Sequence, residues 1–169
     1  EETGTQIIHF QQAFHGRSGY TLSLTNTADP RKTAYFPKFR WPRVHNPKLR
    51  FPLDESTLAM VVEAEKQAEE EILTHLAGAG QDIAAIIIEP IQGEGGDNHF
   101  RKEFFVTLRR ICDEHELLLI MDEVQTGVGL TGAFWAYEHF GVAPDLLSFG
   151  KKTQVCGVLA GPRMDLVKD

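Results

Sequence analysis

The sequence of 169 residues contains only two cysteines, Cys112 and Cys156, and neither belongs to a CxxC pair. It therefore offers no disulfide framework and no metal-ligand pattern, and we expect no metal site and a reducing, cytoplasmic location. No run of eighteen apolar residues is present, which excludes a transmembrane helix, and no membrane partner is expected. Internal repeats are missing as well, and a composition of 42% apolar and 24% charged residues excludes a mainly disordered, collagen-like or coiled-coil chain.

Positive charge is scarce, because 17 basic side chains face 24 acidic ones and the formal net charge is −7. This balance argues against a nucleic-acid-binding surface, and no nucleic acid is expected as a partner. A basic cluster at residues 31–50 is interleaved with prolines and aromatic residues and could be read as a nucleic-acid patch. Given the acidity of the whole chain, we interpret this cluster as a dimer contact or part of a substrate channel.

The first half of the chain predicts one strand, an irregular segment and a long helix. Residues 5–10 have the pattern of a short strand, and residues 28–54 contain five prolines, which exclude regular ladders and helix interiors. Ser56 is the predicted N-cap of the helix, which ends at Gly78 and Gly80. Its apolar stripe consists of Leu58, Val61, Val62, Ala68, Ile72 and Leu76.

From residue 83 onward, the pattern alternates between strand and helix. Continuous apolar runs at Ile83–Ile88 and residues 117–121 are typical of strands buried on both faces, and Leu146–Phe149 is a third strand. Residues 101–115 and 131–140 are the predicted helices between them. Two such strand–helix–strand units predict an α/β fold with a mostly parallel sheet and helical crossovers.

An ionisable side chain follows each predicted strand. Glu89 follows the first strand and Asp122 the second, and Lys151 and Lys152 follow the third. Because ligands bind beyond the carboxyl ends of parallel strands, carboxylates and an amine meeting at one edge indicate a site. These groups suit Schiff-base chemistry with pyridoxal phosphate, or phosphate binding by a glycine-rich loop and a lysine. The glycine-rich loop at residues 93–96 contains an acid and lacks Walker spacing, which favours the first interpretation.

Four motifs, in the expected order, resemble those of class III (ω-amino acid) aminotransferases, which are pyridoxal-phosphate enzymes of fold type I. They are Ala-Phe-His-Gly-Arg at 13–17, Glu-Pro-Ile-Gln-Gly-Glu-Gly-Gly at 89–96, Leu-Ile-Met-Asp-Glu-Val-Gln-Thr-Gly at 119–127 and Pro-Asp-Leu-Leu-Ser-Phe-Gly-Lys-Lys at 144–152. The resemblance covers nearly the whole chain. It implies that residues 1–169 are a fragment, the central part of the large domain of a homodimeric enzyme. The phosphate-binding part and the C-terminal small domain would then lie outside it.

The resemblance also assigns cofactor-binding roles. It makes Lys151 the residue that bonds covalently to pyridoxal phosphate, and Asp122 the partner of the pyridine nitrogen. Gln125 would bond the phenolic oxygen, and Val124 and Phe14 would cover the two faces of the ring. Plain core packing is the alternative for Val124 and Phe14. Lys152 is expected to point away from Lys151 because side chains alternate along a strand.

Two further residues are assigned to the substrate by the same resemblance. Arg17 would hold the α-carboxylate of the amino acid, with a surface salt bridge as the alternative. Glu94 would pair with an arginine outside this chain and mask it while a substrate presents its amine end, with a solvated loop acid as the alternative. His15 receives no catalytic role and is interpreted as a hydrogen-bonding structural histidine.

Within the family, residues 15–27 and 149–157 resemble the branch that transfers the ε-amino group of L-lysine to 2-oxoglutarate. The implied products are 2-aminoadipate 6-semialdehyde and glutamate. The 4-aminobutyrate aminotransferases share the double lysine and a segment like residues 95–99, so this or another ω-amino acid remains the alternative donor. A truncated fragment without activity of its own is the remaining hypothesis.

Overall fold

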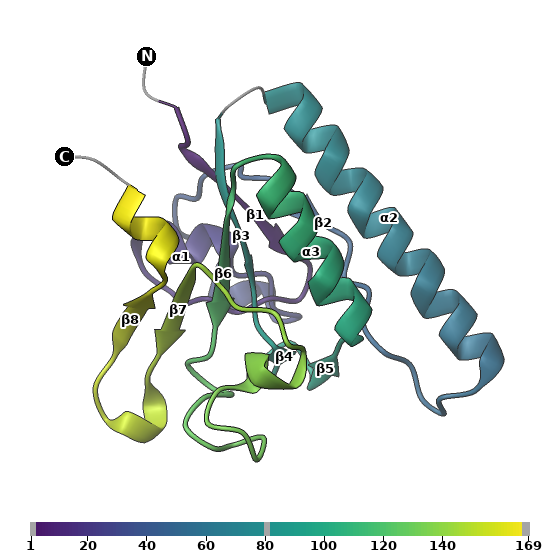
Figure 1. Cartoon of the computed structure of the whole chain (residues 1–169). Coiled ribbons are helices and arrows are strands. Elements are labelled where there is room, and N and C mark those ends of the chain that lie inside the picture. Colours follow the sequence, from purple (N-terminus) through teal and green to yellow (C-terminus); the bar gives the residue numbers. More distant parts are fainter. Residues whose placement is uncertain (1–2, 80–81, 167–169) are drawn as a thin grey trace.

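Six strands form one mostly parallel sheet in the computed structural model, which describes residues 3–79 and 82–166 (Figure 1). Their order across the sheet is β2-β1-β3-β6-β7-β8. The strands are β1 (Gln6–Phe10), β2 (Arg43–Val44), β3 (Ile83–Ile88), β6 (Leu118–Asp122), β7 (Leu146–Phe149) and β8 (Gly157–Ala160). All neighbouring pairs are parallel except β7 and β8, which are antiparallel. The predicted fold class is therefore confirmed.

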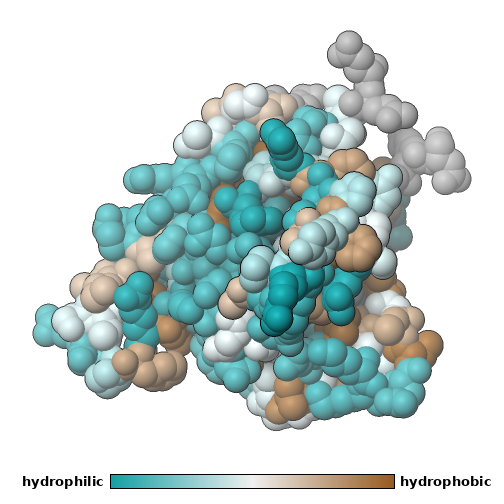
Figure 2. All heavy atoms as spheres, turned by 180° about the vertical axis from the view of Figure 1, so that it is seen from behind, coloured by the Kyte–Doolittle hydropathy of each residue, from teal (hydrophilic) through white to brown (hydrophobic). Residues whose placement is uncertain are grey.

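The helices and the short hairpin surround this sheet. They are α1 (Gly19–Leu24), α2 (Glu55–Ala79), α3 (Lys102–Glu114), the hairpin β4 (Ile91–Gln92) and β5 (Asn98–His99), and the 3₁₀ turns Pro30–Lys32, Ala136–His139, Lys151–Thr153 and Pro162–Leu166. Helices α2 and α3 lie over the face of the sheet that is turned to the viewer in Figure 1. The opposite side of the molecule is largely hydrophilic, with small apolar groups between the polar ones (Figure 2). No helix in the described ranges is long and apolar enough to cross a membrane.

The hydrophobic core lies between the sheet and helices α2 and α3. Helix α3 contributes Phe104, Leu108 and Ile111, whose three- and four-residue spacing places them on one buried face. The Phe104 ring meets the ring of Phe10 edge-on, with 5.7 Å between ring centroids. Full burial of such side chains stabilises the fold by about 1.5–3 kcal/mol each. This core holds β1, β3 and β6 in register, so their carboxyl ends lie at one edge.

The start of α2 differs from the prediction. The helix begins at Glu55, and the side chain that caps it belongs to Asp54, whose Oδ1 accepts hydrogen bonds from the Thr57 N–H and the Ser56 hydroxyl, both at 2.8 Å. Aspartate is a strong N-cap because its carboxylate accepts without needing to donate. Leu58 is exposed, so the buried stripe starts at Val61.

The end of α2 and the predicted helix at 131–140 also differ. Gly78 lies inside α2, and Gly80 lies outside the described residues. Only Ala136–His139 is helical between β6 and β7, as a 3₁₀ turn. The left-handed backbone of Gly132 interrupts a regular helix, and the buried carboxylate of Glu123 fixes the turn by accepting the N–H groups of Ala136 and Tyr137 at 2.7 and 2.8 Å.

Asp145, just before β7, joins three parts of the fold. Its Oδ2 accepts the Leu119 N–H at 2.7 Å and an Arg109 N–H at 2.9 Å. The Asp145 side chain is 10% exposed and the Arg109 side chain 19%. The backbone N–H of Asp145 donates to the Leu119 carbonyl at 2.9 Å, and its carbonyl accepts the Gly161 N–H at 2.7 Å. This residue therefore fixes β7 against β6, α3 and the segment that follows β8.

We expect Asp145→Ala to lower the free energy of unfolding by about 1–3 kcal/mol, because it leaves the buried Leu119 N–H without its acceptor and removes one of the two carboxylates that pair with Arg109. Urea unfolding followed by circular dichroism measures this loss. The matched control is Glu114→Ala, which removes an exposed ion pair with Arg110 and should cost less than about 1 kcal/mol. A loss for Asp145→Ala that equals the control would contradict the role given to this carboxylate.

Candidate active site

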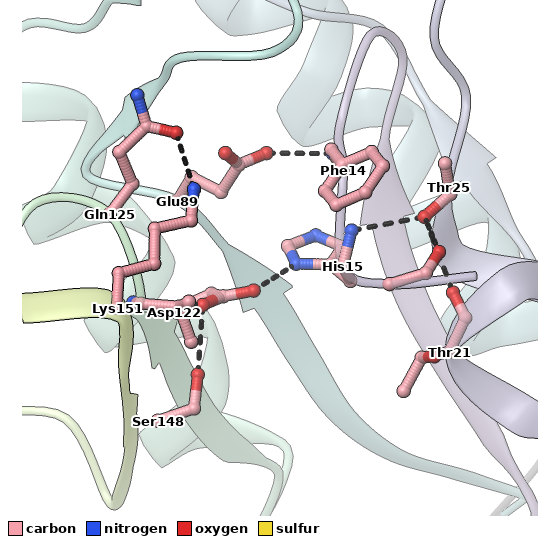
Figure 3. A network of polar contacts seen from close by, with 11 residues as sticks. Phe14, His15, Thr21, Thr25, Glu89, Asp122, Gln125, Ser148 and Lys151 are labelled. Atoms are coloured by element: carbon pink, nitrogen blue, oxygen red, sulfur yellow. Dashed lines mark hydrogen bonds and ion pairs between the residues drawn. The ribbon is translucent and has the colours of Figure 1, made fainter. Parts of the chain in front are cut away.

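A cavity of about 120 Å³ lies beyond the carboxyl ends of β3, β6 and β7. It is lined by Phe14, His15, Gly16, Glu89, Glu94, Asp122, Val124, Gln125 and Lys151. The lining residues come from the loop after β1 and from the segments that follow the three strands, and most of them are drawn in Figure 3. Two larger hollows, of about 400 and 410 Å³, are lined by cationic, amide, aromatic and other uncharged side chains without a carboxylate. The combination of carboxylates and a lysine amine, rather than volume, therefore makes the smaller cavity the candidate active site.

Asp122 ends β6, and its carboxylate is stabilised by three hydrogen-bond partners. Its Oδ2 contacts His15 Nδ1 at 2.8 Å, and its Oδ1 accepts the Ser148 hydroxyl at 2.9 Å and the Val124 N–H at 3.2 Å. Burial works to raise the pKa of Asp122, but the hydrogen bond and charge of His15 and the two other donors outweigh it and hold the pKa below its usual range. An ionised carboxylate only accepts, so Nδ1 of His15 bears the proton that is shared with Asp122.

Glu89 directly follows β3, and its pKa is shifted in the direction opposite to that of Asp122. It is 6% exposed, and its Oε1 accepts the Phe14 N–H at 2.8 Å (Figure 3). Burial raises the pKa of Glu89 to about 7, and the nearby charge of Asp122 acts in the same direction, whereas His15, the Phe14 N–H and Lys151 only partly oppose the rise. Near neutral pH, this carboxyl group therefore exchanges a proton while Asp122 stays ionised.

The loop after β1 is fixed to the site by its backbone. Besides the Phe14 N–H, the His15 N–H donates to Thr25 Oγ1 at 3.0 Å, and the Thr25 hydroxyl donates to the Gly16 carbonyl at 2.7 Å. The imidazole of His15 is 1% exposed, and its Nε2 is buried without a hydrogen-bond partner among the described residues. Two consecutive residues of this loop are thus held at the carboxyl ends of two neighbouring strands. Glu89, directly after β3, holds Phe14, and Asp122, at the end of β6, holds His15.

The two lysines lie in a 3₁₀ turn (Lys151–Thr153) rather than in a strand. Strand alternation therefore does not set the direction of Lys152, whose Nζ donates to the Gln125 carbonyl at 3.2 Å and which is not among the residues that line the cavity. Lys151 is exposed, has a left-handed backbone with φ of 52°, and donates from Nζ to Gln125 Oε1 at 2.9 Å. A non-glycine residue in this region is strained by about 1–3 kcal/mol, which is a recurrent feature of functional sites. Of the two lysines, Lys151 lines the cavity.

Of the two residues expected to bind substrate, Glu94 lines the cavity and Arg17 does not. Glu94 lines the cavity and is exposed, and its carboxylate pairs with Lys32, whose hydrogen bond and charge hold the pKa of Glu94 below its usual range. Arg17 is exposed and is not among the residues that line the cavity, although it directly follows Gly16, which is. The structure therefore brings together all the candidate site residues except Arg17.

Sequence reasoning gave no functional role to Glu89, His15 or Ser148. The position of Glu89 at a strand end was visible in the sequence, but its burial and its hold on Phe14 were not. His15 is hydrogen-bonded, as interpreted, but its partner Asp122 is 107 positions away. Ser148 could have been found from the register, because parallel pairing of β6 and β7 places it beside Asp122.

The sequence and the fold match a known class of enzyme. The family model of class-III aminotransferases matches residues 1–162, and the chain belongs to this family. An L-lysine-epsilon aminotransferase of Mycobacterium tuberculosis is 59% identical over 167 residues, which are 98% of this chain and 36% of that protein. The solved structure of lysine aminotransferase from M. tuberculosis has a TM-score of 0.91 and 56% identity, and the match covers 96% of this chain and 37% of that one.

A second group of relatives is less similar. The mitochondrial 4-aminobutyrate aminotransferase of Mus musculus is 40% identical over 155 residues, which are 89% of this chain and 31% of that protein. The chain spans about a third of the length of the curated relatives it matches. The 169 residues of this chain are therefore sufficient to show the family.

Glu89 predicts a dependence of stability on pH. Its pKa is about 7 in the folded protein against an ordinary 4.5, so the folded state retains a proton that the unfolded state has lost. Stability relative to Glu89→Gln should therefore fall as the pH rises from 4.5 to about 7, by about 3 kcal/mol over the whole interval. Urea unfolding at a series of pH values measures the difference.

The control for this series is Glu94→Gln. Because the pKa of Glu94 is lowered by Lys32, stability relative to this variant should change in the opposite direction and should fall as the pH drops through the pKa of Glu94. A difference between wild type and Glu89→Gln that stays constant with pH would show that Glu89 has an ordinary pKa in the folded protein.

Proposed function

We propose that the full-length protein is a pyridoxal-phosphate-dependent aminotransferase that transfers the ε-amino group of L-lysine to 2-oxoglutarate. The main support is that an ionised, buried aspartate and a lysine amine line the same small cavity. The similarity to lysine aminotransferases, which exceeds that to 4-aminobutyrate aminotransferases, supports lysine as the donor.

The side chains that line the cavity fit the ring of this cofactor. Asp122 supplies a permanent negative charge for a protonated pyridine nitrogen, and the Gln125 carboxamide can donate a hydrogen bond to a phenolic oxygen. Phe14 and Val124 supply apolar surface for the ring, and Lys151 supplies the primary amine for an aldehyde. When bound, pyridoxal phosphate accepts the electron pair that is released as a C–H bond next to the amine breaks.

The side chains around the cavity would have different roles in this reaction. Asp122 holds the proton on the ring nitrogen, and His15 and Ser148 hold the Asp122 carboxylate in place through both of its oxygens. The Lys151 amine would hold the cofactor, and the same amine could take the proton from the carbon that bears the substrate's amino group. Gln125 accepts a hydrogen bond from this amine and so fixes its position.

The substrate is held by charged groups at the rim of the cavity in this proposal. Arg17 binds the α-carboxylate of lysine through the two parallel donors of its guanidinium group. Glu94 masks an arginine outside this chain while the donor is bound, and releases it when the dicarboxylate 2-oxoglutarate enters. Its present pairing with Lys32 supports the idea that this carboxylate exchanges cationic partners.

We further propose that residues 1–169 form the central part of the cofactor-binding large domain, and that the enzyme is a homodimer in the cytoplasm. The cysteines support a reducing compartment, because Cys112 and Cys156 are both free thiols. The aromatic and basic segment at 31–50 is the part of this chain we assign to a dimer contact, since Tyr35, Phe36 and Phe39 are exposed there.

The test is amino transfer by the full-length protein loaded with pyridoxal phosphate, measured as glutamate formed from 2-oxoglutarate. We expect L-lysine to have a higher kcat/KM than 4-aminobutyrate. Lys151→Ala should lower kcat by about 10²–10⁴-fold because it removes the proton-transferring amine.

The matched control is the neighbouring Lys152→Ala, which should keep near wild-type turnover because Lys152 is not among the residues that line the cavity and its Nζ bonds backbone carbonyls. A higher kcat/KM with 4-aminobutyrate would mean that 4-aminobutyrate, and not L-lysine, is the preferred donor. Equal loss of turnover in the two lysine variants would contradict the role of Lys151.

Glu94→Gln tests the exchange of partners. The variant leaves the masked arginine permanently available, so the half-reaction with L-lysine should slow more than the half-reaction with glutamate. The donor preference should change about tenfold to hundredfold, because one charge-assisted hydrogen bond is lost. Single-turnover kinetics with each donor measure the two rates, and equal slowing of both would mean that Glu94 does not select the substrate.

A further inference from the structure

Gly93 lies against the side chain of Gln125. A Cβ atom placed on Gly93 would come within 2.7 Å of three carboxamide atoms of Gln125, namely Nε2, Cδ and Oε1. Gly93 is not among the residues with positive φ in the described part of the chain, so its backbone would accept other residues. The need for glycine here is therefore one of space and not of conformation.

The same carboxamide also forms a hydrogen bond with the site lysine. Its Oε1 accepts the hydrogen bond from Lys151 Nζ at 2.9 Å (Figure 3). A side chain at position 93 would have to push the carboxamide out of the position in which it meets this amine. The flexible Gln125 side chain can yield while the backbone stays in place, so the expected cost falls on the site rather than on the fold.

Gly93 also begins the turn on which Glu94 lies. Its carbonyl accepts the N–H groups of Gly96 and Asp97 at 3.1 and 3.2 Å. Gly95, in the same turn, has a different constraint, because a Cβ there would collide with the backbone carbonyl of Gln12. A substitution at Gly95 would distort the packing of two loops, whereas the three atoms nearest to a Cβ on Gly93 all belong to one flexible side chain.

We propose that Gly93 is a positioning residue that acts through Gln125: it leaves the space in which the carboxamide lies and thereby fixes the amine of Lys151. The turn of Glu94 and the Gln125–Lys151 hydrogen bond are then one packed unit. This inference rests on the proposed function, because it takes Lys151 to be the residue that holds pyridoxal phosphate.

The test is a double-mutant cycle on the full-length protein with Gly93→Ala, Gln125→Ala and the pair. Two readouts are the dissociation constant of pyridoxal phosphate and the pH at which its bound visible absorption changes. Gly93→Ala and Gln125→Ala should each weaken cofactor binding about two- to tenfold, as expected for one lost hydrogen bond, and shift the absorption transition in the same direction. In the Gln125→Ala background, Gly93→Ala should have almost no further effect, since no carboxamide remains to be displaced.

The matched control is Gly78→Ala in α2, where a Cβ meets nothing within 4 Å, and which should leave both readouts unchanged. Additive effects of the two site substitutions, or a silent Gly93→Ala, would overturn the inference. If Gly93→Ala alone fails to fold, folding of the double variant supports the inference, and failure of the double variant overturns it. Transfer of the amino group from L-lysine by the wild-type protein reports separately on the proposed function.

Discussion

The buried negative charge of Asp122 is the constraint around which this structure is arranged. A carboxylate with 11% of its side chain exposed stays ionised only because donors surround it. These donors come from the loop after β1, from its own strand end and from β7. The parallel sheet therefore serves as the frame that brings two distant segments, the loop after β1 and strand β7, within hydrogen-bond distance of one carboxylate.

Much of the fold could be predicted from the sequence because its signals are local. The apolar run of β3 has one interpretation in a chain of this composition, and the residues that follow buried parallel strands must lie at a common edge. This reasoning placed Asp122 and Lys151 together without any knowledge of distances. The motif at 13–17 added Phe14, whose place in the cavity no periodicity could have indicated.

The remainder depended on contacts that no local pattern contains. The helix predicted at 131–140 failed because the carboxylate of Glu123 fixes a short turn there, and the burial of that carboxylate follows from the tertiary fold. Strand alternation could not set the direction of Lys152 because the chain leaves the strand before Gly150. The pKa of Glu89 depends on how completely other segments cover it, which composition alone does not determine.

The hydrogen bond between His15 and Asp122 spans 107 positions, and β1 pairs with β3 across the whole of α2. Closing loops of this length costs conformational entropy before any contact compensates for it, so such topologies form slowly. The binding edge has no local precursor: a chain that ends at Met121 contains all of β1 and β3 and still lacks Asp122, the charge around which the edge closes. A ligand at this edge therefore depends on pairing between distant parts of the chain and not on any one local element.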